Sequence, residues 1–164
     1  MVNATRLDDV SIVLLLGPCY MTDTEIYTKN IKTGVISYVP VKDITSDKYQ
    51  VYSKKLDKFI PIRSVAVTNS SNRMIFIEKN AISNNVPSKD LYITPGHVMI
   101  YCGKEVKARC YPHNKRIKIE PTKIYNITTD ERTTIMASNI EVVADNHDYF
   151  TSRYGPEGNF WTED

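Results

Sequence analysis

The sequence predicts a single all-β domain. Short runs rich in Val, Ile, Tyr and Thr follow one another along the 164 residues, and turn residues separate them at short intervals. Tyrosine alone contributes 11 residues, which suits the half-buried faces of sheets. No long segment repeats its apolar residues with the period of an amphipathic helix. The chain length fits one domain with a core of its own.

The expected strands fill the middle of the chain, and two turns support their division. Asn30–Gly34 reverses the chain early on, and Cys102-Gly103 forms a two-residue hairpin loop in which Gly103 takes a positive φ. The one helical candidate is Ile77–Asn84, so we expect at most one short helix. The strands are expected at Glu25–Thr28, Gly34–Val41, Tyr49–Ser53, Phe59–Thr68, Met74–Ile77, Leu91–Thr94, Val98–Tyr101, Glu105–Cys110, Arg116–Glu120, Lys123–Thr128, Thr133–Met136 and Ile140–Val143.

Charge and composition exclude several classes of function. The net charge is only +2, and acidic residues interrupt or flank the basic stretch Lys104–Lys118, which is more typical of a solvated hairpin than of a phosphate-binding patch. We therefore expect no nucleic-acid partner. The apolar run Val10–Leu16 is too short to cross a bilayer, so no membrane span is expected. The three cysteines are an odd number, which favours a reducing, cytoplasmic compartment over a disulfide framework.

No cofactor or metal is predicted. Cys102, Cys110 and His113 lack the spacing of a zinc site, and the chain has no Gly-rich phosphate loop. Taken singly, Cys19 and His97 are more often a buried structural thiol and a structural histidine than catalytic groups. Their meaning depends on the motifs around them.

Three sequence blocks, in order along the chain, resemble the hedgehog/intein (Hint) family, in particular the intein-like branch found in bacterial and viral proteins. The first block opens on a Cys-aromatic pair, the middle one contains Thr-Pro-x-His, and the last pairs two strands around a tight turn. The middle block is the most specific. The matching residues are Cys19, Tyr20, Thr24, Ile26 and Thr28, then Pro87, Asp90, Leu91, Thr94, Pro95 and His97, then Tyr125, Ile127, Ala137, Ser138, Asn139 and Glu141.

The resemblance implies a compact, horseshoe-like β domain that acts on its own chain as a monomer. Cys19 would attack the preceding carbonyl, that of Pro18, and leave a thioester. His97 would hydrogen-bond to the Cys19 amide nitrogen and protonate it, and Thr94 would hold the same amide or the developing oxyanion. Asp130 would replace the acidic or histidine residue that many relatives carry where this chain has Arg132.

Departures from the family pattern narrow this function. Val143-Ala144 stands where splicing inteins carry His-Asn, so cleavage at Cys19 without splicing is expected. The crowded carbonyl of Pro18 should make this cleavage slow. The expected layout is a candidate cleaved leader at 1–18, the Hint domain at 19–144 and an extension at 145–164. Two alternatives stay open: a catalytically degenerate Hint module that serves as a structural or interaction domain, and an unrelated β-barrel binding module.

Overall fold

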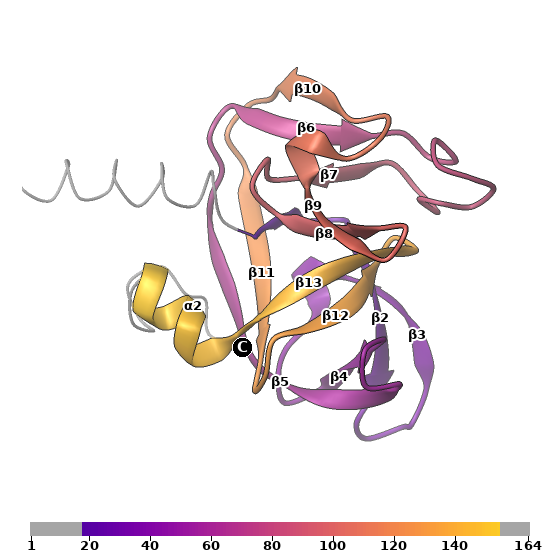
Figure 1. The fold of residues 1–164 in the computed structure, drawn as a ribbon. Coiled ribbons are helices and arrows are strands. Elements are labelled where there is room, and N and C mark those ends of the chain that lie inside the picture. Colours follow the sequence, from indigo (N-terminus) through magenta and orange to yellow (C-terminus); the bar gives the residue numbers. More distant parts are fainter. Residues whose placement is uncertain (1–17, 155–164) are drawn as a thin grey trace, which may run out of the picture.

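A computed structural model of the protein describes residues 18–154, and within this range the chain is a single all-β unit with one α-helix (Figure 1). The all-β prediction is confirmed. The α-helix is α2 (His147–Tyr154), and two short 3-10 helices are η1 (Val41–Asp43) and η2 (Ala108–Cys110). The strands are β1 (Tyr20–Met21), β2 (Glu25–Asn30), β3 (Ile36–Pro40), β4 (Tyr49–Ser53), β5 (Lys58–Asn69), β6 (Arg73–Ile77), β7 (Leu91–Ile93), β8 (Val98–Tyr101), β9 (Lys104–Lys107), β10 (Lys115–Lys118), β11 (Lys123–Thr129), β12 (Thr133–Ala137) and β13 (Ile140–Asn146).

Two long antiparallel strands, β5 and β11, connect the two ends of the molecule in Figure 1. On one side, β11 continues through β1, β7 and β6 to β10. On the other side, β5 leads through β4, β2 and β12 to β13, and β13 returns to pair in parallel with β11 at Thr128↔Asp145. Those six strands therefore form a closed ring. The edge strands β8 and β9 extend from β13.

The core fills the interior of this arrangement. Strand β12 shows how the sequence builds it, since its residues alternate between buried and half-buried positions along the strand. A second, smaller apolar cluster joins Cys19 to Met74 and Ile124, on the outer side of β1 and β11. The largest fully buried side chains are Tyr20, Phe150, Ile26, Met74, Ile75, Ile77, Leu91, Ile93, Met99, Ile124 and Ile127.

Both predicted turns are confirmed. Cys102 and Gly103 have φ values of 50° and 76°, and Tyr101 pairs with Lys104 across them, which is the geometry of a two-residue hairpin loop. Gly34 has a φ of 74°, and the side-chain oxygen of Asn30 accepts hydrogen bonds from the N–H groups of Lys32 and Thr33. A substitution at Gly34 would force an L side chain into a left-handed conformation.

The expected helix at Ile77–Asn84 was wrong. Asn80 and Asn85 take positive φ values there, and the Asn80 side chain accepts a hydrogen bond from the Asn85 N–H, so the segment forms consecutive turns. The α-helix lies instead in the segment that was expected to be an extension. Strand β13 runs two residues past the expected boundary at 144, and Phe150 of α2 is fully buried. The candidate leader up to residue 17 and residues 155–164 lie outside the described residues.

Candidate active site

Strand β1 places Cys19 beside Thr94. Tyr20 pairs with Ile93 of β7 on one side and with Tyr125 of β11 on the other, so the residue before Tyr20 meets the residue after Ile93. The Cys19 N–H donates to Thr94 Oγ1 at 3.0 Å, and the Thr94 N–H donates to the Cys19 carbonyl at 3.0 Å. The Thr94 hydroxyl also lies 3.3 Å from that carbonyl. Thr94 thus holds both backbone groups of Cys19.

His97 is fully buried next to this pair. Its own N–H donates to the Thr94 carbonyl at 3.1 Å, and its carbonyl accepts from the Ala108 N–H at 2.8 Å. The imidazole packs on the Tyr20 ring, with 4.5 Å between the ring centroids. Its Nε2 atom lies 3.1 Å from the Val143 carbonyl oxygen. The fold therefore brings residues from β1, the β7–β8 loop and β13 to one place.

The Val143 contact fixes the protonation of the His97 ring. A carbonyl oxygen accepts and cannot donate, so Nε2 carries the proton and the neutral ring keeps its lone pair on Nδ1. No described group hydrogen-bonds to Nδ1, although it is buried. Burial lowers the pKa of His97 to about 4, although the backbone groups of Val143 and Cys19 partly oppose this shift. The ring is a neutral base at pH 7.

The hydrogen bond expected between His97 and the Cys19 amide is replaced by another. The Cys19 N–H donates to Thr94 Oγ1, on the threonine that directly follows β7 and that was expected to hold this amide. Burial raises the pKa of the Cys19 thiol, and the negative charge of Asp145 raises it further. Cys19 therefore rests as a neutral thiol, and any attack by its sulfur requires removal of the thiol proton.

Solved structures of inteins share this arrangement of strands. A DnaB intein from Synechocystis sp. superposes with a TM-score of 0.55 at 11% identity, covering 79% of this chain and 99% of its own. A bacterial intein-like domain from Clostridium thermocellum gives 0.52 at 13% identity, covering 78% and 98%. The gp41-1 intein gives 0.53 at 10%, covering 79% and 100%. The chain has the Hint fold of inteins. The protein-family models and the curated proteins contain no match to the sequence.

The Hint fold also brings Asn126 to the site, which the sequence reading missed. The β1–β11 register pairs Tyr20 with Tyr125, so one further step places Cys19 opposite Asn126. Ile124, two residues from Asn126 on the same face of β11, packs with Cys19 in the small apolar cluster. Asn126 is 1% exposed, and neither its amide nitrogen nor its oxygen has a hydrogen-bond partner among the described residues. An unpaired buried amide costs stability, so its place beside Cys19 indicates a function.

A cavity of about 330 Å³ opens the Hint site to the outside. Pro18, Gly96, Val143 and Asp145 contribute to its wall, so the residue before the Cys19 nitrogen is reached from here. Burial raises the pKa of Asp145. The sequence places Asp145 in the expected extension, and its only signal is an acidic residue directly after the apolar Val142–Ala144 run.

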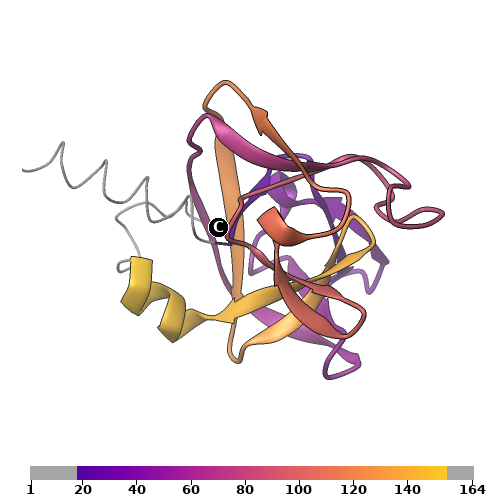
Figure 2. The ribbon, with the colours of Figure 1, turned by 45° about the horizontal axis from the view of Figure 1, so that its top comes forward.

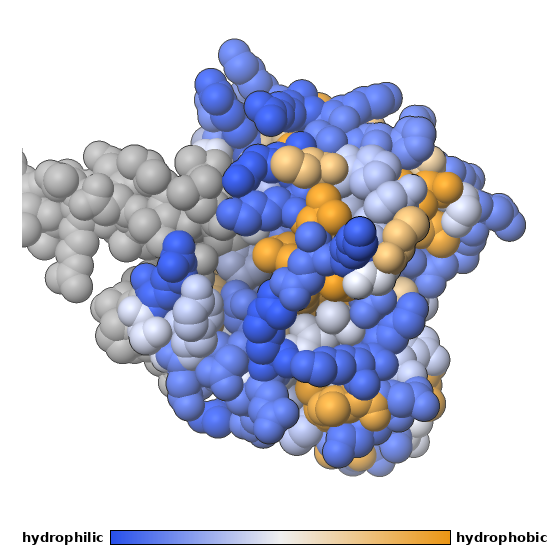
Figure 3. Space-filling model, viewed as in Figure 1, coloured by the Kyte–Doolittle hydropathy of each residue, from blue (hydrophilic) through white to orange (hydrophobic). Residues whose placement is uncertain are grey.

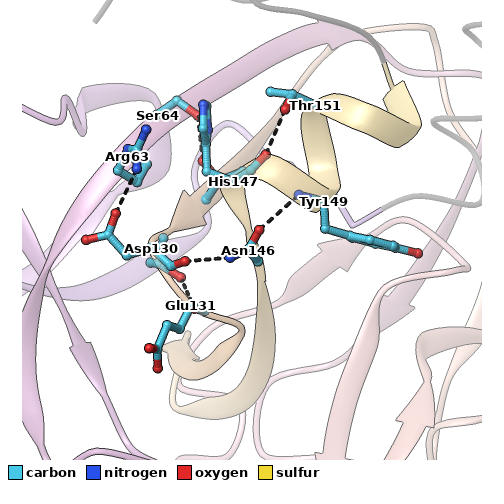
Figure 4. Close-up of polar contacts among 10 residues, drawn as sticks. Arg63, Ser64, Asp130, Glu131, Asn146, His147, Tyr149 and Thr151 are labelled. Carbon is cyan, nitrogen blue, oxygen red and sulfur yellow. Dashed lines mark hydrogen bonds and ion pairs between the residues drawn. The ribbon is translucent and has the colours of Figure 1, made fainter.

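Arg132 and Asp130 have structural roles apart from Cys19. Arg132 also lines the cavity, and its guanidinium forms a two-pronged ion pair with the carboxylate of Glu105. Asp130 is exposed and pairs with Arg63 at 2.9 Å (Figure 4). Along β11, five residues separate it from the partner of Tyr20, which amounts to roughly 16 Å. The expectation of a catalytic Asp130 is therefore corrected, because the strand carries it away from the nucleophile.

The junction of β13 and α2 is held by a separate polar cluster (Figure 4). His147 Nδ1 lies 3.1 Å from the hydroxyl of Ser64 and 3.0 Å from that of Thr128, and the two hydroxyls are 2.6 Å apart. The Asn146 side chain donates to the Asp130 carbonyl and accepts from the Tyr149 N–H. These contacts fix α2 against β5 and β11 and cap its first turn.

The part of the chain that the structure describes contains neither a candidate metal-ligand cluster nor a candidate membrane-spanning helix. Between residues 18 and 154, no group of three His, Cys, Asp or Glu side chains is arranged to hold a metal ion. No described helix has the length and apolar character that a bilayer crossing requires.

Proposed function

We propose that this Hint domain cleaves its own backbone between Pro18 and Cys19 by an N-to-S acyl shift. The observation that carries the proposal is the grip of Thr94 on both backbone groups of Cys19, with the lone pair of a buried His97 beside them. The inteins with the same fold support it as analogy. The nucleophile and the scissile bond belong to adjacent residues, so proximity is built into the chain.

The acyl shift needs no group from outside the site, because the proton removed from the thiol is the one that the amine receives. The Cys19 sulfur bonds to the Pro18 carbonyl carbon through a five-membered ring, and His97 Nδ1 takes the thiol proton. The C–N bond between Pro18 and Cys19 then breaks, and the imidazolium returns its proton from Nδ1 to the Cys19 nitrogen. Asn126 Nδ2 is an unpaired donor beside Cys19 and would stabilise the oxyanion on Pro18. The products are a thioester at Cys19 and a free Cys19 amine.

The cavity beside Pro18 gives water access to this thioester. Asp145 lines it, and burial raises its pKa, which makes its carboxylate a stronger base than that of an ordinary aspartate. Asp145 would take a proton from the attacking water as the water oxygen bonds to the Pro18 carbonyl carbon. The C–S bond to Cys19 then breaks, the Cys19 sulfur leaves and takes up that proton, and the segment ending at Pro18 is released as a free acid. Asp145 thus fills the acidic role that the sequence reading gave to Asp130.

Splicing is not part of the proposal. It would require an asparagine at the end of the domain whose side-chain nitrogen attacks its own carbonyl. Val143-Ala144 occupies that place in the motif, and the nearby Asn146 uses its nitrogen to donate to the Asp130 carbonyl and its oxygen to accept from Tyr149. Its amide is therefore committed to capping α2, and cleavage at Cys19 is the single expected reaction.

A fusion with a folded protein ahead of residue 1 tests the cleavage. On incubation with hydroxylamine or a thiol, we expect the fusion to divide between Pro18 and Cys19, with masses that place the cut there. Cys19→Ala should abolish cleavage, whereas Cys102→Ala, at an exposed thiol outside the site, should leave it unchanged. An intact parent, under conditions where an active intein fusion is cut, would instead support a Hint module without catalysis.

Replacing Pro18 by glycine is expected to accelerate cleavage by about tenfold or more. The proline ring is buried and restricts the rotation that brings the carbonyl onto the Cys19 sulfur. Single-turnover rates of parent and Pro18→Gly fusions, followed by gel or mass spectrometry, measure the effect. Pro40→Gly, at a proline outside the site, should not change the rate. A slower Pro18→Gly variant would show that the ring helps to position the carbonyl.

A further inference from the structure

A second cavity, of about 370 Å³, lies between β6, β10 and η2, away from the cavity beside Pro18. Four basic side chains surround it: Arg73 from β6, Arg109 from η2, and Arg116 and Lys118 from β10. No acidic residue is among the residues that line it. Its volume falls in the range of small-molecule sites. Figure 2 shows η2 close to the β6–β10 pair, and along the chain η2 comes just before β10, whereas β6 comes much earlier.

The positive charge of this cavity is not neutralised by the protein. The β6–β10 register puts Arg73 directly opposite Lys118, and like charges in that position destabilise a sheet. None of the four cations forms an ion pair with a described carboxylate. Lys115, at the start of the same strand, does: its Nζ lies 4.0 Å from Glu78. On these two strands, the cations that line the cavity are thus the unpaired ones, whereas Lys115 outside it has an acidic partner.

Apolar side chains complete the wall. Ile75, Pro95 and Ile117 line the cavity together with the cations, and Figure 3 shows hydrophilic residues over the β6–β10 end of the molecule with an apolar area exposed below them. A ligand that fits this combination carries several negative charges next to a flat or apolar body. Arg guanidinium groups suit both parts, since they bind phosphate oxygens in pairs and stack on aromatic rings.

We propose that this cavity binds a nucleoside polyphosphate, with the phosphate chain among the four cations and the base against Pro95 and Ile117. The charge of the triphosphate matches that of the rim. The sequence alone favours a solvated face for the basic stretch Lys104–Lys118. The proposal revises this interpretation, because the fold brings Arg73 from β6 next to Arg109, Arg116 and Lys118 of that stretch around one cavity.

A bound ligand would also stabilise the loop Thr94–His97, and the effect of this on cleavage rests on the proposed function. The Arg109 N–H donates to the Pro95 carbonyl at 3.1 Å, and the neighbouring Ala108 N–H donates to the His97 carbonyl at 2.8 Å. Pro95 itself lies between Thr94 and His97 in sequence. A nucleotide that holds Arg109 and Pro95 therefore stabilises the loop that grips Cys19, and we expect it to raise the cleavage rate.

Calorimetric titration of the full chain, carrying Cys19→Ala so that it stays intact, tests the binding. We expect adenosine triphosphate to bind with a Kd on the order of 10–100 µM, and the affinity to fall as salt is added. Arg73→Ala and Lys118→Ala should each weaken binding by about fivefold or more, and Lys115→Ala, the paired lysine of the same strand, by less than about twofold. Circular dichroism of each variant checks that it is folded.

Titrations with tripolyphosphate and with a short oligonucleotide test the two halves of the proposal, the phosphate site and the base contact. Weaker binding of tripolyphosphate than of adenosine triphosphate supports a contact to the base, and equal binding overturns that half of the proposal. No heat with either ligand, or equal loss in Lys115→Ala, overturns the site. Tighter binding of a short single-stranded oligonucleotide overturns it in favour of a nucleic-acid surface. Binding is measured without cleavage, so an inactive fusion would refute the proposed function and leave this result standing.

Discussion

His97→Gln is expected to slow cleavage between Pro18 and Cys19 by about 10²- to 10⁴-fold, the usual range for loss of a general acid–base group. Glutamine can still donate to the Val143 carbonyl, which keeps the loop in place. It cannot take the thiol proton and return it to the Cys19 nitrogen. Single-turnover cleavage of the fusion measures the loss. His113→Gln, at a histidine outside the site, is the matched control, and an unchanged rate in His97→Gln would exclude the proposed proton transfer.

The same variant should change the pH dependence of stability. His97 is neutral and buried in the folded chain, where its pKa is about 4, whereas the unfolded chain takes up a proton near the ordinary value of 6.5. Stability from this group is therefore complete above pH 6.5 and is lost as the pH falls through this window, by about 3 kcal/mol in all. Urea unfolding of the Cys19→Ala chain at pH 7.5 and 4.5 should show this decrease, and His97→Gln should remove most of it.

Most of the strands were predictable because a local sequence signal marks them. Alternating apolar residues with polar turn residues between the runs place nearly every strand to within a few residues, as in β4 and β8, and the Cys102-Gly103 loop takes the predicted geometry. The two-residue strand β1 carries no such signal. It exists because β7 and β11 provide hydrogen-bonding partners on both of its sides.

The residues of the site that lie close together in sequence were predictable, whereas those that only the pairing of strands brings together were not. Thr94 and His97 belong to one loop, and their motif indicated Cys19 as its partner. Asn126 and Asp145 come to Cys19 through strand register, on β11 and β13, and a register is a property of the folded sheet. Asp130 attracted attention because it is near Arg132 in sequence, but the direction of β11 takes it to the other end of the ring.

Thr94→Val should reduce both cleavage and stability, because valine has the shape of threonine without its hydroxyl. The Cys19 N–H would lose its acceptor in a buried place, which costs about 1–3 kcal/mol of unfolding free energy. The cleavage rate should fall by about 10²- to 10³-fold, since the scissile amide is no longer oriented.

Thr94→Ser separates these effects from general damage to the loop. Serine keeps the hydroxyl that accepts from Cys19 N–H, so it should restore most of the cleavage rate while giving up only the contacts of one methyl group. If Thr94→Ser were as slow as Thr94→Val, the methyl packing of Thr94 would matter and not its hydrogen bond. Recovery of the rate with serine would instead identify the Thr94 hydroxyl as the group that holds the Cys19 amide for attack.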